Sequence, residues 1–215
     1  MKVLVTGGNG FIGSEVARQA AARGWSVIAL ARRGRPDGDA SWLDGVTWVA
    51  ADALEPDGWR DRLAGCAAVI HCVGSIRGPN LELINGDAAI RVAEAAERAG
   101  IGAFVFISAS AKPPLVGDGY LRGKRRAEAR VAELRMRAVI LRPGFVFGTR
   151  RFPSLPAAWA LRLAGALPVV GVAARRSRPL AVETVARAAL RAAEEGEVRG
   201  VLEVDDIERL GRGEA

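Results

Sequence analysis

Tyr120 and Lys124 are the two side chains whose types and spacing most clearly suggest chemistry. Tyr120 is the only tyrosine in the chain, and Lys124 is one of three lysines, with Lys2 and Lys112. Residues four positions apart share one face of a helix. A lysine ammonium lowers the pKa of a neighbouring phenol, which makes the phenol a usable general acid or base. The spacing therefore predicts proton transfer at Tyr120 with Lys124 in support.

A glycine-rich turn in the stretch 2–13 has the spacing of a dinucleotide site. Gly7, Gly10 and Gly13 satisfy T-G-x-x-G-x-x-G, and Gly8 completes an overlapping G-x-G-x-x-G. Glycines let backbone amides approach a ligand, and the helix that follows favours negative charge at its N-terminus. Such a triplet between a strand and a helix is a strong signal. The turn predicts binding of a dinucleotide pyrophosphate, and a tight turn without a ligand is the alternative.

The end of the next strand indicates which dinucleotide is bound. An NAD-type site places an acid about twenty residues past the turn, but this chain has Arg32 and Arg33 there. A guanidinium is suited to a ribose 2′-phosphate. The sequence therefore predicts NADP(H) in preference to NAD(H), with solvent-facing arginines as the alternative.

Further cofactor contacts are expected where later strands end, since ligands bind at the carboxyl edge of such sheets. Asp52 offers a carboxylate to an adenine amino group, or is simply a turn residue. Lys124 is suited to the nicotinamide ribose, whereas His71 lies in an apolar strand and is expected in the core. The predicted cofactor contacts are Gly7, Gly10, Phe11, Ile12, Gly13, Arg32, Arg33, Asp52, Ala53, Cys72, Val73, Gly74, Lys124, Pro143 and Val146.

The elements that position these residues alternate along the chain. After the first strand, strands are expected over 25–31, 46–51, 67–73, 103–108 and 138–141, and helices over 11–23, 56–63, 83–99 and 120–135. This alternation predicts an α/β fold, a Rossmann-type doubly wound parallel sheet with strand order 3-2-1-4-5-6 and helices on both faces. Beyond it we expect helices over 153–167 and 183–194, short strands over 168–172 and 200–204, the latter as a possible seventh strand, and a frayed tail from residue 208.

The amino-acid composition argues against several other classes of function. The 215 residues carry a formal charge of +7, which indicates a solvated basic surface or, alternatively, an anionic partner. A single histidine argues against a histidine metal site, and Cys66 and Cys72 form no disulfide framework. No signal peptide, membrane span or nucleic-acid motif is visible. We expect one domain over 1–215 in the cytoplasm, with peripheral membrane contact as an open alternative.

Several motifs together resemble the short-chain dehydrogenase/reductase family, in its extended or atypical (NmrA-like) form. They are TGGNGFIG, VIHCVG, FVFISAS, YLRGK followed by RRAE, LRPGFVFG and RPLAVETVARA, which together cover residues 2 to about 190. The resemblance implies that Tyr120 and Lys124 act with a serine or threonine just past the fifth strand. At that position this chain has Ala109, so Ser110 or Ser108 is the candidate substitute. Loss of the hydroxyl would cost on the order of 10²-fold in rate.

These departures are similar to the atypical members related to the nucleotide-binding accessory subunit of respiratory complex I and to ubiquinone-biosynthesis proteins. That resemblance implies firm NADP(H) binding, often without turnover. Two functions therefore stay open: an oxidoreductase acting through Tyr120 and Lys124, and a non-catalytic NADP(H)-binding sensor, assembly factor or accessory subunit.

The segment 145–180 is the expected substrate-side lobe. It is compact and apolar, which argues against a sugar-nucleotide substrate and is typical of either core residues or a pocket for a quinone-like molecule. The identity of the small apolar substrate and the oligomeric state are not predicted.

Overall fold

A parallel sheet of seven strands forms the centre of the molecule within the described residues, which are 1–113, 115–148 and 178–213 of a computed structural model. Each strand pairs in parallel with its neighbours, so all carboxyl ends lie at one edge. In spatial order the strands are β3 (Val46–Ala50), β2 (Ser26–Ala31), β1 (Lys2–Thr6), β4 (Ala68–His71), β5 (Ala103–Ile107), β6 (Arg137–Leu141) and β9 (Gly200–Leu202). The predicted order 3-2-1-4-5-6 is confirmed, and the strand near residue 200 is the seventh.

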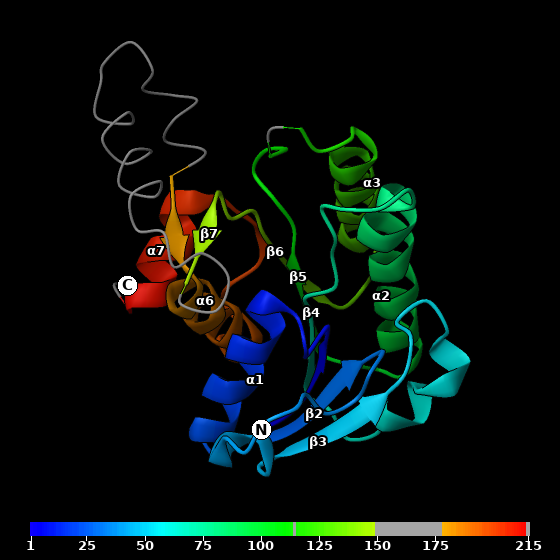
Figure 1. Ribbon diagram of the computed structural model, residues 1–215, viewed down its shortest axis with the longest axis vertical. Coiled ribbons are helices and arrows are strands. Elements are labelled where there is room, and N and C mark those ends of the chain that lie inside the picture. The colour runs from blue at the N-terminus through cyan, green and yellow to red at the C-terminus, as the bar shows by residue number, and fades with distance from the viewer. Residues whose placement is uncertain (114, 149–177, 214–215) are drawn as a thin grey trace.

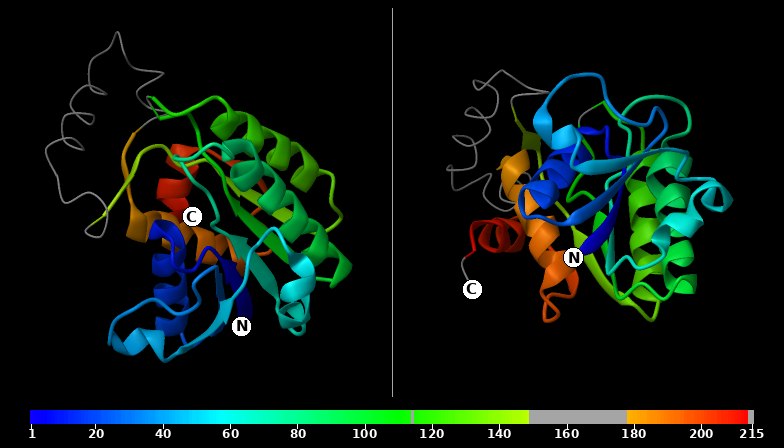
Figure 2. Two further views of the ribbon diagram at one scale, coloured as in Figure 1. Left: turned by 45° about the vertical axis from the view of Figure 1, so that its right-hand side comes forward. Right: turned by 90° about the horizontal axis from the view of Figure 1, so that it is seen from below.

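Helices cover both faces of this sheet (Figures 1 and 2). On one face lie α1 (Phe11–Ala22), α6 (Val182–Glu194) and α7 (Val204–Arg212), and on the other lie α2 (Ala88–Arg98) and α3 (Gly119–Ala132). Strand residues alternate between the two resulting cores because successive side chains point to opposite faces. Val3 and Val5 pack on the α1 side, whereas Leu4 packs on the α2 side. A short parallel pair, β7 (Val146–Phe147) with β8 (Leu180–Ala181), stands apart from the main sheet.

Two glycines let the helix that carries Tyr120 and Lys124 approach its neighbour closely. Gly86 belongs to a π-helical turn, Leu83–Asp87, that precedes α2, and Gly123 lies in α3. A Cβ at Gly123 would stand 2.8 Å from the carbonyl oxygen of Glu82 and 3.0 Å from the amide nitrogen of Gly86. No side chain larger than hydrogen fits there without displacing backbone. The contact therefore sets how closely α3 packs against the π-helical turn.

Three expected elements differ from those in the structure. The helix expected over 83–99 begins with the π-helical turn, and that expected over 56–63 consists of two 3₁₀ turns, Pro56–Gly58 and Arg60–Leu63. The prediction of a frayed tail from residue 208 is wrong, because α7 continues to Arg212. Glu203 and Asp206 form a reciprocal capping box at its start, and Val204 and Ile207 are buried against the core. The elements expected over 153–167 and 168–172 lie outside the described residues.

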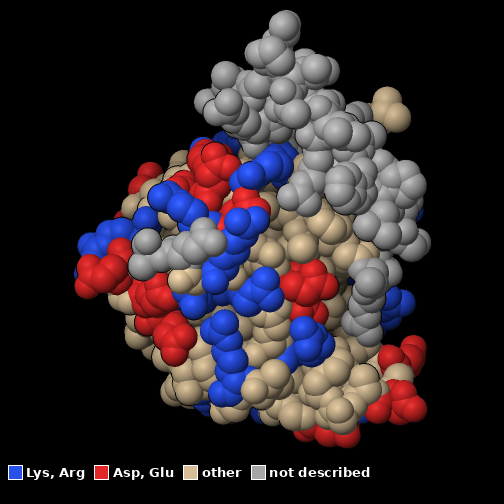
Figure 3. Space-filling model, turned by 90° about the vertical axis from the view of Figure 1, so that its left-hand side faces the viewer, with Lys and Arg blue, Asp and Glu red and all other residues tan. Residues whose placement is uncertain are grey.

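Opposite charges alternate on the face formed by α6 and α7 (Figure 3). Arg191 pairs with Glu195, and Arg209 pairs with Asp206, each one helical turn apart. This pairing supports the interpretation of the arginines on this face as a solvated surface. None of the helices in the described parts of the chain is long and apolar enough to cross a membrane.

The glycine contact generates a stability prediction that opposes helix propensity. Replacing glycine by alanine inside a helix ordinarily stabilises it by about 1 kcal/mol. At Gly123 we expect the reverse, a loss of about 1–3 kcal/mol, because the added methyl group meets backbone of the π-helical turn.

Gly119→Ala is the matched control in the same helix, since a Cβ there would lie 3.5 Å from its nearest neighbour, an ordinary contact. Denaturant unfolding of the two variants and the parent chain measures the difference. Equal or higher stability of Gly123→Ala would contradict the close contact.

Candidate functional site

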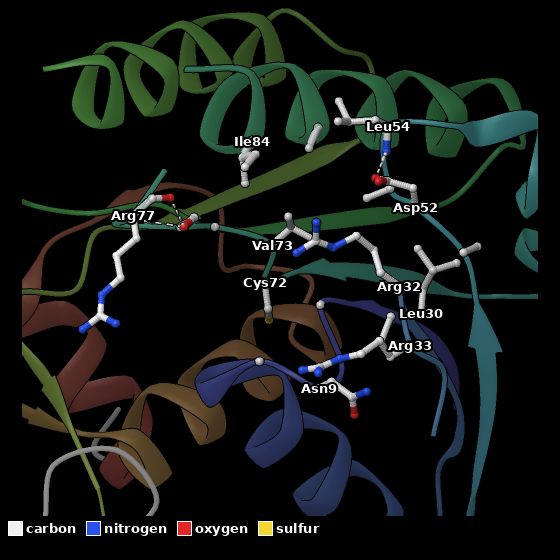
Figure 4. A pocket seen from close by; sticks show the side chains of 18 residues that line it. Asn9, Leu30, Arg32, Arg33, Asp52, Leu54, Cys72, Val73, Arg77 and Ile84 are labelled. Atoms are coloured by element: carbon white, nitrogen blue, oxygen red, sulfur yellow. Dashed lines mark hydrogen bonds between the residues drawn. The ribbon is translucent and has the colours of Figure 1, made fainter. Parts of the chain in front are cut away.

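A cavity of about 510 Å³ opens at the carboxyl ends of β1, β2, β3 and β4, on both sides of the point where the strand order reverses (Figure 4). This crevice is where open α/β sheets bind ligands. Its lining comes from the turns that follow these strands and from the start of α2. The lining residues are Gly7, Asn9, Gly10, Leu30, Ala31, Arg32, Arg33, Ala51, Asp52, Ala53, Leu54, Cys72, Val73, Gly74, Ser75, Arg77, Ile84 and Ala88.

The glycine turn forms one wall of the cavity and has no room for side chains. Gly7 has φ +74°, and its amide donates to the carbonyl of Leu30 at 2.8 Å. A Cβ at Gly13 would lie 2.2 Å from the Gly7 carbonyl oxygen, and one at Gly10 would lie 2.9 Å from it. Helix α1 starts directly behind this turn with no side-chain cap and no acidic residue in its first turn. The turn and the helix dipole thus fit an anionic group such as a pyrophosphate.

Two arginines follow β2 and enter the same cavity (Figure 4). Within the described residues neither Arg32 nor Arg33 has a carboxylate partner, so their charge is available to a ligand. Asn9 lies beside them, and its Nδ2 donates to the carbonyl of Gly34 at 2.6 Å. The Oδ1 of Asn9 is buried and has no hydrogen-bond partner among the described residues. An orphaned acceptor of this kind suits a hydroxyl or amino group of a bound molecule.

Asp52 is a turn residue that also lines the cavity. Its Oδ1 accepts from the amide of Leu54 at 2.9 Å, which makes it a turn residue. The same side chain also lines the cavity (Figure 4). The turn therefore presents the carboxylate at the end of the site where an adenine is expected.

Lys124 is the buried cation of the site. It is 3% exposed, and its Nζ donates to the carbonyl of Ile107 at 2.8 Å and lies 4.8 Å from the centre of the Phe106 ring. A Cβ at Gly74 would come within 3.4 Å of the ammonium, so the glycine keeps the approach to Lys124 open. Burial lowers the pKa of Lys124 to about 8. Lys124 is not itself a lining residue, but its ammonium lies beside Gly74, which is one.

Tyr120 lies in the first turn of α3, one turn before Lys124. Burial raises the pKa of Tyr120, and the charge of Arg125 offsets this only in part. The expected lowering of the phenol pKa by Lys124 is therefore absent, because burial of the phenolate is the largest effect and the positive charge that opposes it is that of Arg125. The phenol is held in its protonated form.

The hydroxyls near the end of β5 have different surroundings. Ser108 donates to Glu128, a buried carboxylate that also accepts from Arg142 Nη2 at 2.6 Å. Burial opposes ionisation of Glu128, but these hydrogen bonds hold its pKa below the ordinary value. Ala109 is buried, whereas the Oγ of Ser110 is enclosed without a hydrogen-bond partner among the described residues. Of the two candidate serines, only Ser110 keeps its hydroxyl available.

The cavity gathers nine of the predicted cofactor contacts, from Gly7 to Gly74 in the chain. Phe11, Ile12 and Gly13 lie in the first turn of α1 instead of the lining, and Pro143 and Val146 lie beyond it, the latter in β7. Lys124 is also absent from the lining and lies behind Gly74. His71 is buried as expected, with its Nδ1 2.9 Å from Thr6 Oγ1. Sequence analysis missed Asn9, Ser75 and Arg77. The first belongs to the glycine motif and was detectable, but the other two follow β4 in a loop without a motif.

The buried ammonium predicts how stability depends on pH. A lysine in the unfolded chain titrates near 10.5 but has a pKa of about 8 in the fold, so between these values the unfolded state binds more protons. Stability should therefore rise with pH from about 8, with a slope of at most about 1.4 kcal/mol per pH unit. The thiol of Cys72, with its pKa raised by burial to about 12, acts in the opposite direction only above its ordinary value of 9.0.

Denaturant unfolding between pH 7.5 and 9, compared with Lys124→Met, isolates the contribution of Lys124 together with its coupling to Cys72 and Glu128, because groups that do not interact with Lys124 cancel in the difference. Parallel pH profiles of the two proteins would show that Lys124 is not buried as a titrating cation.

Comparisons with known proteins agree with this geometry. The sequence profile of an NAD(P)H-binding family matches residues 7–150. A chloroplastic protein of Arabidopsis thaliana that is described as uncharacterized is 37% identical over 155 residues, which are 70% of this chain and 52% of that protein. A ceramide reductase of Caulobacter vibrioides is 32% identical over 214 residues, which are 97% of this chain and 66% of the reductase. The chain thus spans about half of the first relative and about two thirds of the second.

The fold also recurs in a solved structure, that of the Bordetella bronchiseptica enzyme WbmG in complex with NAD. The TM-score is 0.70 at 19% identity, over 94% of this chain and 71% of that one. The narrower resemblance to complex I and ubiquinone-biosynthesis proteins stays a prediction. The family match covers the glycine turn, the cavity and the helix with Tyr120 and Lys124, and on that basis the chain belongs to the NAD(P)H-binding family.

Proposed function

We propose that this protein is an NADP(H)-dependent oxidoreductase that reduces a carbonyl group, or oxidises the corresponding alcohol, beside Tyr120 and Lys124. The observation that carries the proposal is the buried Lys124 ammonium at the cavity edge, one helical turn from a protonated phenol. A buried cation costs free energy unless it has a partner, and its location beside the cavity is best explained by a role there.

The cofactor is held by residues that already fit its parts. The glycine turn and the start of α1 take the pyrophosphate, and Asp52 lies at the adenine end. Arg32 and Arg33 take the ribose 2′-phosphate, which is the basis for preferring NADP(H). Lys124 donates to the nicotinamide ribose. When bound, the nicotinamide supplies or accepts the hydride.

Tyr120 supplies the proton that the carbonyl oxygen needs on reduction. Because burial keeps the phenol protonated, the side chain is a general acid in this direction and a base in the reverse one. The unpartnered hydroxyl of Ser110 stabilises the reacting oxygen in place of the missing group at Ala109. The Ser108 hydroxyl is held by Glu128 and supports α3 instead.

The substrate proposed is a small molecule with an apolar body. The relative that is named a ceramide reductase supports both reduction and an apolar substrate. Most of the segment 145–180, where the sequence predicts an apolar lobe, lies outside the described residues. Cytoplasmic location with peripheral membrane contact stays part of the proposal, and nucleic acid is not a proposed partner.

One observation favours a second function, cofactor binding without turnover. Ala109 stands at the position of the expected catalytic hydroxyl, and the neighbouring Ser108 is engaged by Glu128. A sensor or accessory subunit needs the cavity but not a complete set of catalytic groups.

Cofactor preference gives the first test. We expect the dissociation constant for NADPH to be at least about tenfold lower than that for NADH, since a guanidinium–phosphate pair contributes about 1.5–3 kcal/mol. Arg32→Gln combined with Arg33→Gln should remove this preference and leave NADH binding unchanged. Tryptophan fluorescence follows binding, because Trp48 packs beside Gly8. Equal binding of both cofactors to the parent chain would contradict the 2′-phosphate site.

Turnover gives the second test. NADPH oxidation is followed with a panel of aldehydes, ketones and quinones, and Tyr120→Phe should lower kcat by about 10²-fold or more while NADPH binding is retained. Ser110→Ala should lower kcat by about 10²-fold. Ser108→Ala is the matched control and should mainly lower stability. Tight NADPH binding by the parent chain, with no oxidation of NADPH by any compound, would favour the non-catalytic function.

A further inference from the structure

Three arginines line the cavity, and they are divided between its two ends. Figure 4 shows Arg32 on the same side as Asp52 and Leu54, with Arg33 nearby, whereas Arg77 lies at the opposite side. Within the described residues, Arg77 has neither an ion pair nor a side-chain hydrogen bond. Its guanidinium is therefore a second source of positive charge, separate from that assigned to the cofactor's 2′-phosphate.

The loop that carries Arg77 runs from the neighbourhood of Lys124 to that of Tyr120, the two residues to which we assign chemistry. It begins at Gly74, where a Cβ would lie 3.4 Å from Lys124 Nζ. It leads into the helical turn that contains Glu82, whose amide nitrogen would lie 3.5 Å from a Cβ at Gly119, the residue before Tyr120. Arg77 thus belongs to the segment between the Lys124 ammonium and the start of α3, at the reacting end of the cavity.

The backbone at this loop is fixed by a buried amide. Asn85 is fully buried, and its Oδ1 accepts from the amide of Ser75 at 3.1 Å while its Nδ2 donates to the Ser75 carbonyl at 2.8 Å. The Ser75 hydroxyl in turn donates to the carbonyl of Arg77 at 2.8 Å and accepts from its amide at 3.1 Å. The position of Arg77 is therefore set by hydrogen bonds at its base, which lowers the entropic cost of binding through its side chain.

Glu82, the single acidic residue of the segment 74–82, is already paired with other arginines. Glu82 lies 3.5 Å from Arg122 and 3.6 Å from Arg126, both on α3. It therefore does not neutralise Arg77. The reacting end of the cavity keeps an excess of positive charge, which attracts a negative group.

We propose that Arg77 is a specificity-determining residue that binds an anionic group, a carboxylate or a phosphate, on the carbonyl substrate. This inference rests on the proposed oxidoreductase function and adds that the apolar substrate carries a negative charge at one end. The planar fork of a guanidinium matches both anions in geometry.

Matched aldehydes test this assignment. Benzaldehyde, 4-carboxybenzaldehyde and 4-formylphenyl phosphate share the reacting group and differ only in charge. Their dissociation constants are measured by calorimetry on the NADP⁺-saturated protein, and their KM and kcat by NADPH oxidation. We expect one of the two anionic aldehydes to bind about two- to fivefold more tightly than benzaldehyde, as for an ion pair at an exposed site. The aldehyde that binds more tightly shows whether Arg77 prefers a carboxylate or a phosphate.

Arg77→Gln should abolish this difference in both the dissociation constant and KM. It should leave kcat, benzaldehyde binding and NADPH binding unchanged. Arg98→Gln, which removes an exposed charge at the end of α2, is the control for net charge. Retention of the preference in Arg77→Gln, or its absence in the parent chain, would overturn the inference. Weaker NADPH binding in Arg77→Gln would assign the residue to the cofactor instead. If the parent chain does not bind NADPH at all, the proposed function itself fails. That outcome differs from a failure of the Arg77 assignment, in which NADPH still binds.

Discussion

The close approach of α1 to the end of β1 is the constraint on which the site depends. A single added carbon at Gly13 would stand 2.2 Å from the Gly7 carbonyl, so only glycine allows the helix to begin there. Because of this contact, the N-terminus of α1 faces the crevice between β1 and β4 with its amides and its dipole.

A second pair of glycines acts in the same manner on the opposite face. Gly86 and Gly123 let α3 pack against the π-helical turn before α2, and this packing lowers Lys124 into contact with Ile107 and Phe106. The burial that follows changes the chemistry of the helix. It brings the pKa of Lys124 to about 8 and raises that of Tyr120. The close packing at Gly86 and Gly123 thus accompanies the burial that shifts the pKa values of two side chains in the same part of α3.

At the carboxyl edge of the sheet, some charged side chains are paired with one another and others have no carboxylate partner among the described residues. Glu128 is buried and satisfied by Ser108, Arg125 and Arg142, and it ties α3 to the ends of β5 and β6. The arginines of the cavity, by contrast, have no carboxylate partner in the described part of the chain. Paired charges hold the scaffold together, whereas the unpaired charges line the cavity, where a bound anion would neutralise them.

The sequence by itself determined the sheet order and the glycine turn, because alternation of strands with helices and the spacing of glycines are local patterns. It also indicated Arg32 and the pair Tyr120 and Lys124. It could not show that α7 is a stable helix or that Ser108 is engaged by Glu128, since both depend on contacts between segments distant in the chain. The direction of the Tyr120 pKa and the place of Arg77 were likewise decided only by tertiary structure, because burial and loop position arise when separate elements pack together.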